Sequence, residues 1–182
     1  MRLLLLADTH LVPHDRAARG RGDPRHPRGA RDLPAAVWAE VERADVVVHA
    51  GDWVTADLLD ALEARARRVV GVWGNNDGPD LRARLPEVAV EELGGIRVGV
   101  VHETGAAAGR ESRMDRLYAG RVDVLVFGHS HIPWDTVTPG GIRLLNPGSP
   151  TDRRRQPVAT YLTAEAAGGA LLDVRLHPVP RG

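Results

Sequence analysis

The chain has 182 residues, which is enough for one domain with a single sizeable core and too few for two full domains. Hydrophobic residues make up 43% and charged residues 26%, as is ordinary for a soluble globular protein, and 24 basic residues are balanced by 24 acidic ones. The zero net charge argues against bulk nucleic-acid binding, and the lack of cysteine excludes disulfides and thiolate metal sites. We therefore expect a single domain over residues 1–182.

Five short apolar runs predict buried strands in the first two thirds of the chain. They are rich in Val and Leu and apolar at nearly every position, which is typical of strands covered on both faces. The runs are 3–7, 46–50, 69–73, 96–101 and 122–127. The first is too short for the apolar region of a signal peptide and ends at Asp8. No stretch approaches the roughly 20 apolar residues of a membrane span, and we expect a cytoplasmic location.

Helical patterns separate these runs, and hairpin signals follow them. Helices are predicted over 34–43, over 55–67 with Thr55 as the N-cap, and more weakly over 110–119. Short strands separated by Gly-rich turns are expected from Trp134 onward, at 135–138, 142–145, 158–163 and 170–177. The pattern predicts an α/β fold in which two packed sheets form a sandwich flanked by helices. Residues 14–32 are dense in Arg, Gly and Pro without periodicity and indicate a long irregular loop.

Polar residues with the chemistry of metal ligands follow the five apolar runs, at the point where each run ends. Ligand sites form just beyond the carboxyl ends of strands, so these side chains are expected to converge. In Asp-x-His and His-x-His, residues i and i+2 of an extended chain point the same way. The predicted ligands are Asp8, His10, Asp52, Asn75, His102, His129 and His131.

This set of residue types favours a metal site. Imidazoles and carboxylates suit divalent Mn, Fe, Zn, Co or Ni. Seven ligands exceed the needs of one ion, and a bridging carboxylate would let them hold two ions about 3.5–4 Å apart. Each motif alone is ordinary, since Gly-Asp and Gly-Asn-Asn-Asp are common turns and a lone histidine is more often structural. Their occurrence together, in order and each at a strand end, favours a two-metal centre.

The ordered series Asp-x-His, Gly-Asp, Gly-Asn-x-Asp, His and Gly-His-x-His resembles the calcineurin-like metallophosphoesterases. The short length and the turn Asn146-Pro147-Gly148-Ser149 resemble the small bacterial and archaeal phosphodiesterase branch of that family (YfcE-like). The resemblance spans residues 2 to about 165. It implies a β-sandwich flanked by helices, in agreement with the fold expected from the apolar runs.

The resemblance also implies a ligand assignment and a reaction. One metal would be held by Asp8, His10, Asp52 and His131, and the other by Asp52, Asn75, His102 and His129, with Asp52 bridging. Asp52, Asn75 and His102 are the expected catalytic residues. The implied activity is a metal-dependent phosphodiesterase that uses a metal-activated hydroxide on a small phosphoester, with nucleotide-like substrates among the candidates. Manganese is the preferred metal, with Fe, Zn, Ni or Co as alternatives, and a homo-oligomer is compatible with the family.

Two positions depart from the family pattern. Many members have a histidine at Asn76 that is assigned to protonating the leaving group, although the YfcE-like branch commonly lacks it. Because Asn76 cannot donate a proton at neutral pH, slow cleavage of esters with poor leaving groups is expected. The second departure is Glu103, where the family often has glycine, and this side chain either orients a ligand histidine or faces solvent.

Several further residues have both a functional and a structural interpretation. Arginines of the 14–32 loop would suit a polyanionic substrate, but a solvated loop is preferred. Asn76 and Arg153 are candidate substrate-binding residues, although a surface turn explains Arg153 equally well. Trp53 could stack on an aromatic group, but packing in the core is favoured, as it is for Trp73 and His49.

Two alternative functions remain open from the sequence. A phosphomonoesterase would use the same core, since residue types alone give no pocket dimensions. A non-catalytic scaffold that binds another protein is the other alternative, and relatives of that kind exist in the superfamily. Their mark is a decayed metal site, whereas every predicted ligand is intact in this chain.

Overall fold

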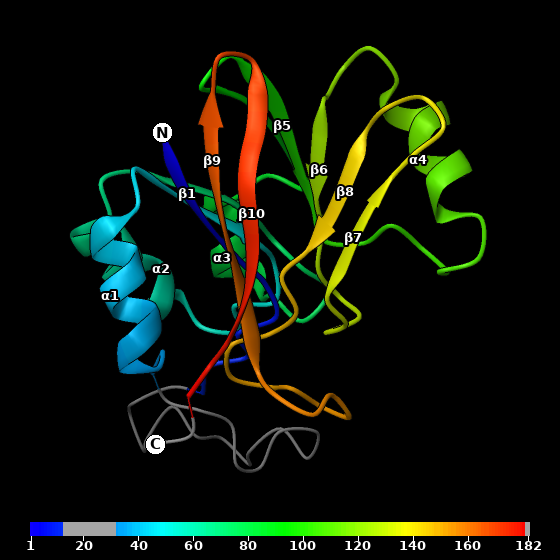
Figure 1. Ribbon diagram of the computed structural model, residues 1–182. Coiled ribbons are helices and arrows are strands. Elements are labelled where there is room, and N and C mark those ends of the chain that lie inside the picture. The colour runs from blue at the N-terminus through cyan, green and yellow to red at the C-terminus, as the bar shows by residue number, and fades with distance from the viewer. Residues whose placement is uncertain (13–31, 181–182) are drawn as a thin grey trace.

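A computed structural model of the chain describes residues 1–12 and 32–180, and its two five-stranded sheets pack face to face (Figure 1). The first sheet has the order β10-β9-β1-β2-β3. Its strands are β1 (Arg2–Leu6), β2 (Val46–Ala50), β3 (Val69–Val72), β9 (Thr160–Ala167) and β10 (Ala170–Pro178). β1, β2 and β3 are parallel, and β9 runs antiparallel to β1 and β10.

The second sheet has the order β4-β5-β6-β8-β7. Its strands are β4 (Val88–Leu93), β5 (Ile96–Val101), β6 (Val124–Val126), β7 (Trp134–Val137) and β8 (Arg143–Asn146). β5, β6 and β8 are parallel, while β4 and β7 pair antiparallel at the two edges. The hairpins β9–β10 and β7–β8 confirm the antiparallel closure expected from the C-terminal turn signals.

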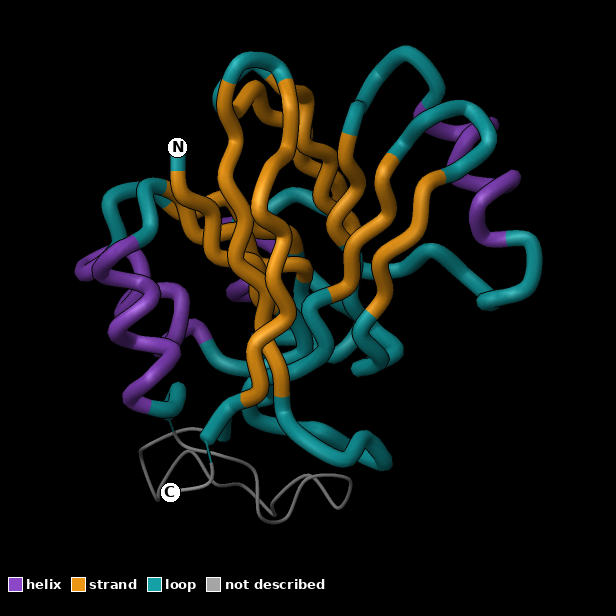
Figure 2. The backbone as a smooth tube through the Cα atoms, viewed as in Figure 1, coloured by secondary structure: helices purple, strands orange, loops and turns teal. Residues whose placement is uncertain are grey.

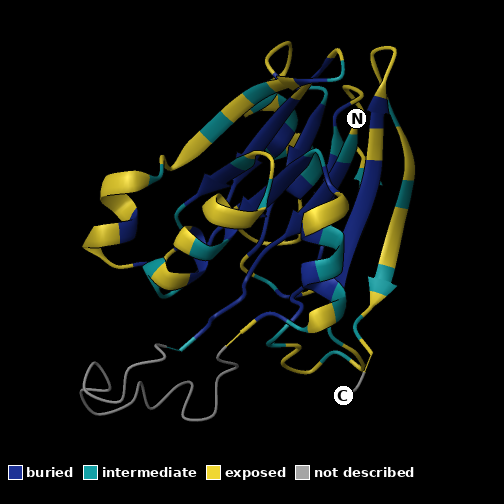
Figure 3. Ribbon diagram, turned by 90° about the vertical axis from the view of Figure 1, so that its left-hand side faces the viewer, coloured by how far each residue is buried: buried dark blue, intermediate teal, exposed yellow. Residues whose placement is uncertain are grey.

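Helices cover the outer faces of the sandwich. α1 (Ala35–Arg43), α2 (Ala56–Arg65) and α3 (Pro79–Arg84) lie on the side of the first sheet, and α4 (Arg110–Tyr118) lies beyond the second (Figure 1). Burial follows this layering, because the strands are dark blue inside and the outer helix faces are yellow (Figure 3). The predicted two-sheet sandwich flanked by helices is confirmed. None of the described helices is long and apolar enough to cross a membrane.

The strand β1 shows why its residues are apolar at every position. Leu3 and Leu5 pack between the two sheets, whereas Leu4 and Leu6 pack under α1 and α2. Successive side chains of a strand point to opposite faces, so a strand between two apolar layers needs leucine or valine throughout.

Some elements differ from the sequence expectation. β4 and the one-and-a-half-turn helix α3 were not predicted, because Glu91 and Glu92 interrupt the apolar pattern of this edge strand and α3 has only six residues. Thr55 occupies the N-cap position of α2 but its side chain makes no capping hydrogen bond. Trp73 lies past the end of β3, an edge strand, and is only half-buried. The predicted loop 14–32 lies outside the described residues except for Asp32.

Parallel strands bring the candidate ligands to one end of the sandwich. β9 points upward in Figure 1, so β1, which is antiparallel to it, points downward together with β2 and β3. β8 also points downward, and β5 and β6 are parallel to it. The carboxyl ends of the parallel strands in both sheets therefore meet at the lower end, where loops gather (Figure 2).

Candidate metal centre

Four candidate ligands form a first buried cluster, which we call cluster A: Asp8, His10, Asp52 and His131. The His10 Nε2 atom lies 3.1 Å from His131 Nε2 and 3.3 Å from Asp52 Oδ2. His131 Nε2 lies 3.8 Å from Asp8 Oδ1. All four side chains are almost fully buried, and those of Asp8, His10 and His131 offer ligand atoms within 4.8 Å of one another.

A second cluster, cluster B, shares Asp52 and adds Asn75, His102 and His129. Asp52 Oδ1 lies 3.4 Å from His102 Nε2. The amide oxygen Oδ1 of Asn75 lies 2.9 Å from His102 Nε2 and 3.0 Å from His129 Nδ1. The two carboxylate oxygens of Asp52 thus face different clusters. The structure brings all seven predicted ligands close together, and Asp8, Asp52 and His102 offer ligand atoms within 4.8 Å of one another across the two clusters.

The backbone reaches these positions through left-handed conformations, which differ from the extended geometry expected from the sequence. Residues i and i+2 of an extended chain were expected to point the same way, but five candidate ligands have positive φ. The values are 55° for Asp8, 43° for His10, 62° for Asp52, 70° for His129 and 57° for His131. Such residues cost about 1–3 kcal/mol each and cluster at functional sites. The surrounding structure therefore stabilises a strained arrangement of donors.

Backbone carbonyls fix which ring nitrogens face the cluster. His102 Nδ1 lies 2.8 Å from the carbonyl oxygen of Ala50, and His131 Nδ1 lies 2.5 Å from that of Asp152. A carbonyl only accepts hydrogen bonds, so each Nδ1 carries the proton. The Nε2 atoms of His102 and His131 therefore face Asp52 and Asp8, and a bound metal would take their lone pairs, as in metal-ligating histidines.

The electrostatics of the centre also fit a cation. Burial raises the pKa of Asp8 to about 7, and its Oδ2 atom is buried with no hydrogen-bond partner among the described residues. Burial also opposes ionisation of Asp52, but the hydrogen bond and charge of His102 hold the pKa of Asp52 below its usual range. The pKa of His102 rises to about 9 because Asp52 outweighs its burial. A divalent cation would supply the charge that these buried oxygens need.

A second layer of polar residues supports the ligand loops. Asp77 is buried and accepts hydrogen bonds from the backbone nitrogens of Asp52, Val54 and Gly74. Ser149 Oγ donates to the carbonyl of Asp8 at 2.7 Å. Asn146 Nδ2 donates to the carbonyl of Gly128 at 2.9 Å. All three supporting residues lie within motifs visible in the sequence, but the sequence indicated no role for them.

The other predicted residues occupy different surroundings. Asn76 contacts the shared ligand, since its backbone N and its Nδ2 donate to Asp52 at 2.9 and 2.6 Å. Glu103 is half-exposed, and its Oε1 lies 3.5 Å from His129 Nδ1. Arg153 is exposed and donates to the carbonyl of Gln156. Burial is the largest influence on the pKa of Asp8 and of His131, and the charge of the neighbouring Arg154 lowers both.

The aromatic and histidine residues that were assigned to the core have mixed outcomes. Trp53 is fully buried, donates from Nε1 to the carbonyl of Val72 at 2.8 Å and stacks on His49 at 3.6 Å between ring centroids. Core packing is thus confirmed for Trp53 and His49. Trp73 instead lines a cavity, with the guanidinium of Arg82 4.0 Å from its ring centroid.

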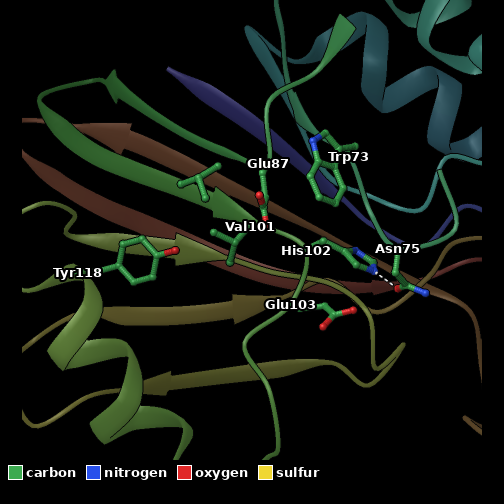
Figure 4. A pocket seen from close by; sticks show the side chains of 8 residues that line it. Trp73, Asn75, Glu87, Val101, His102, Glu103 and Tyr118 are labelled. Atoms are coloured by element: carbon green, nitrogen blue, oxygen red, sulfur yellow. Dashed lines mark hydrogen bonds between the residues drawn. The ribbon is translucent and has the colours of Figure 1, made fainter. Parts of the chain in front are cut away.

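Two cavities adjoin cluster B. The first, of about 270 Å³, is lined by Trp73, Tyr118 and Glu87 together with Asn75 and His102 (Figure 4). The second, of about 430 Å³, is lined by His129, Ser130 and Arg110. Glu103 lines both cavities, and the first opens at Asn75 and His102 while the second opens at His129. The centre therefore has space for a small substrate on two sides.

Gly74 provides a direct test of how tightly the ligand loops pack. A Cβ at this position would collide with the carboxylate and the backbone nitrogen of Asp52. We expect Gly74→Ala to destabilise the fold by about 1–3 kcal/mol and to displace Asp52. Metal affinity should fall about 10- to 100-fold, as it does when support of a ligand is lost.

The matched control for this substitution is Gly78→Ala, four residues later along the chain. Gly78 has a φ of −77°, and an added Cβ would meet nothing within 4 Å. Thermal unfolding and calorimetric Mn²⁺ titration of both variants measure the two effects. Equal behaviour of the two variants would show that Gly74 does not position Asp52.

Comparison with known proteins agrees with this geometry. Residues 1–169 match the family model of the calcineurin-like phosphoesterase superfamily domain. A probable metallophosphoesterase of Methanocaldococcus jannaschii is 36% identical over 155 residues, which are 83% of this chain and 69% of that protein. A probable metallophosphoesterase of Methanothermobacter thermautotrophicus is 34% identical over 132 residues, or 71% of this chain and 74% of the relative.

Solved structures show the same fold. The solution NMR structure of a Thermotoga maritima protein superimposes with a TM-score of 0.69 at 31% identity, covering 97% of this chain and 98% of that one. Chaetomium thermophilum Vps29 superimposes with a TM-score of 0.74 at 17% identity, covering 100% and 97% of the two chains. The ligand series, the sandwich and these matches together show that the chain belongs to the calcineurin-like phosphoesterase superfamily.

Proposed function

We propose that the protein is a metal-dependent phosphodiesterase that works with two divalent metal ions. The observation that carries the proposal is the position of Asp52, whose Oδ2 faces His10 in cluster A and whose Oδ1 faces His102 in cluster B. A carboxylate between two sets of imidazole and oxygen donors is the arrangement that a bridged metal pair requires. Family membership supports a metal-dependent phosphoesterase, and the diester preference and the second ion are our inference.

Each group in the centre has a separate task in this proposal. When bound, the two cations would lower the pKa of water and polarise the phosphoryl oxygens. Asp52 would hold both ions, and Asn75 and His102 would orient the ion of cluster B. The buried carbonyl partners of His102 and His131 keep the ligand rings in place. Imidazole and carboxylate donors suit manganese, with Fe, Zn, Ni or Co as alternatives.

The substrate proposed is a small phosphoester, and a nucleotide-like ester remains a candidate. The cavity of about 270 Å³ beside His102 is also lined by Trp73 and Tyr118, and this aromatic lining would accommodate an aromatic leaving group (Figure 4). A cytoplasmic location and a homo-oligomeric state remain predictions.

Hydrolysis of bis-p-nitrophenyl phosphate with and without Mn²⁺ tests this proposal. We expect metal-dependent turnover in the wild type and its loss in His129→Ala, since His129 contacts Asn75 in cluster B. His177→Ala is the matched control, because His177 bonds Thr163 and stacks on Tyr161. Absence of turnover in a folded, metal-loaded protein would contradict the proposal.

The leaving group should strongly affect the rate, because Asn76 replaces the histidine that many relatives use as a proton donor. Asn76 instead donates two hydrogen bonds to Asp52. For p-nitrophenyl, phenyl and alkyl diesters we expect the rate to fall steeply as the leaving-group pKa rises. General acid catalysis typically raises the rate by about 10²–10⁴-fold, and Asn76→His should recover part of this increase. A flat profile in the wild type, with chemistry shown to limit the rate, would refute this expectation.

Two alternatives are separated by the same assays. A phosphomonoesterase would hydrolyse p-nitrophenyl phosphate and leave the diester intact. A protein-binding scaffold is suggested by the fold similarity to Vps29, one of whose solved structures is a complex with a cyclic peptide. Both clusters contain all of their candidate metal ligands, which favours catalysis over this alternative. A scaffold would show no turnover of either ester in the Mn²⁺-loaded state.

A further inference from the structure

Arg110, the first residue of α4, is buried between two aromatic rings. Its guanidinium carbon lies 4.7 Å from the ring centroid of Phe127 and 4.5 Å from that of Trp134. The residue is only 5% exposed. The rings hold the guanidinium in a defined position through cation–π contacts.

No carboxylate forms a direct ion pair with this cation within the described part of the chain. The side chain of Arg110 makes no hydrogen bond or ion pair with the described residues, and its Nε atom is buried without a partner. Burial lowers the pKa of Arg110 and outweighs the charge of Glu111, which raises it, but arginine stays protonated in proteins. A buried guanidinium nitrogen without an acceptor is costly, and Arg110 also lines an open cavity, so the residue indicates a ligand that completes it.

The cavity next to Arg110 connects it with the candidate metal centre. Arg110 and His129 line the same space of about 430 Å³, together with Ser130 and Trp134. Glu103 also lines it, but its carboxylate lies 3.5 Å from His129 Nδ1 and forms no ion pair with Arg110. The cavity thus has a candidate cationic centre on one side and an unpaired guanidinium on the other.

We propose that Arg110 forms an anion subsite that binds a second phosphate group of the substrate. Guanidinium groups match phosphate oxygens geometrically, and the two aromatic rings leave the edge of the group for such hydrogen bonds. The inference rests on the proposed function and narrows it to phosphoesters that carry a second phosphate. Arg110 would bind this group and would not act on the reacting phosphorus.

Calorimetric binding to the Mn²⁺-loaded protein tests the subsite without requiring turnover. The probes are the bisphosphates of ethane-1,2-diol, propane-1,3-diol and butane-1,4-diol, each compared with the monophosphate of the same diol. We expect one bisphosphate to bind about 10- to 100-fold more tightly than its monophosphate, as for a hydrogen bond between charged groups. Arg110→Met should remove this difference and leave the monophosphate Kd unchanged.

The control is Arg116→Met, which removes the same charge from an exposed position of the same helix. It should keep the full bisphosphate preference. Arg110→Lys retains the charge without the planar fork and should keep only part of the preference. The unfolding temperature of Arg110→Met should not fall, because an unpaired buried charge is removed.

Either of two results would overturn the subsite: no bisphosphate preference in the wild type, or a preference that persists in Arg110→Met. Because binding is measured directly, an inactive protein that still prefers a bisphosphate would contradict the proposed catalysis and leave the subsite supported. A protein that cleaves bis-p-nitrophenyl phosphate without any bisphosphate preference would support the proposed catalysis and contradict the subsite.

Discussion

Asp52→Asn is expected to abolish metal-dependent hydrolysis while leaving the protein folded. The substitution keeps the shape of the side chain and removes the charge that lies between His10 and His102. Removing a group that only supports a metal ligand typically lowers activity about 10- to 100-fold, and the loss in kcat/KM for Asp52→Asn should be larger than this. Steady-state kinetics at saturating Mn²⁺, with circular dichroism to verify folding, measure this effect.

The control for Asp52→Asn is Asp60→Asn on α2. Asp60 forms an exposed ion pair with Arg84, and such pairs contribute little to stability. Its kcat/KM should equal that of the wild type. Wild-type turnover in Asp52→Asn would exclude a bridging role for this carboxylate.

Asp77→Ala is expected to give the largest loss of stability among the substitutions considered. Its carboxylate accepts hydrogen bonds from the backbone nitrogens of Asp52, Val54 and Gly74 at 3.1, 2.8 and 2.7 Å. Each buried donor left without a partner costs about 1–3 kcal/mol, so the free energy of unfolding should fall by more than about 3 kcal/mol. Urea denaturation measures the change.

Asp80→Ala, three residues away, removes the same charge from the exposed first turn of α3. Its effect should stay within about 1 kcal/mol, as for an acidic residue at a helix N-terminus. A similar small effect for Asp77→Ala would mean that the three backbone nitrogens find other acceptors, such as water.

The elements that the sequence predicted well are those in which apolar character is continuous. β2 begins and ends where the run 46–50 does, because each of its residues faces either the helices or the second sheet. The seven candidate ligands were predicted because each follows such a strand. β4 escaped detection because Glu91 and Glu92 interrupt its apolar residues after Val90.

Other features depend on tertiary contacts and left no signal in the sequence. The left-handed backbone of Asp8 and His10 is imposed by the loops around them, since no residue type there favours positive φ as glycine does. Arg110 resembled an ordinary polar residue at a helix start, because Phe127 and Trp134 reach it only in the folded chain. The influence of Arg154 on Asp8 likewise arises between residues distant in sequence.

The central claim is that one carboxylate, Asp52, joins two metal sites, and metal counting during a titration tests it most directly. Metal-free protein would be titrated with Mn²⁺ while bound metal per chain and bis-p-nitrophenyl phosphate turnover are followed together. We predict two ions per wild-type chain, with turnover rising as the second ion binds. A folded chain that binds no ion, or that reaches full turnover with a single ion, would contradict this claim.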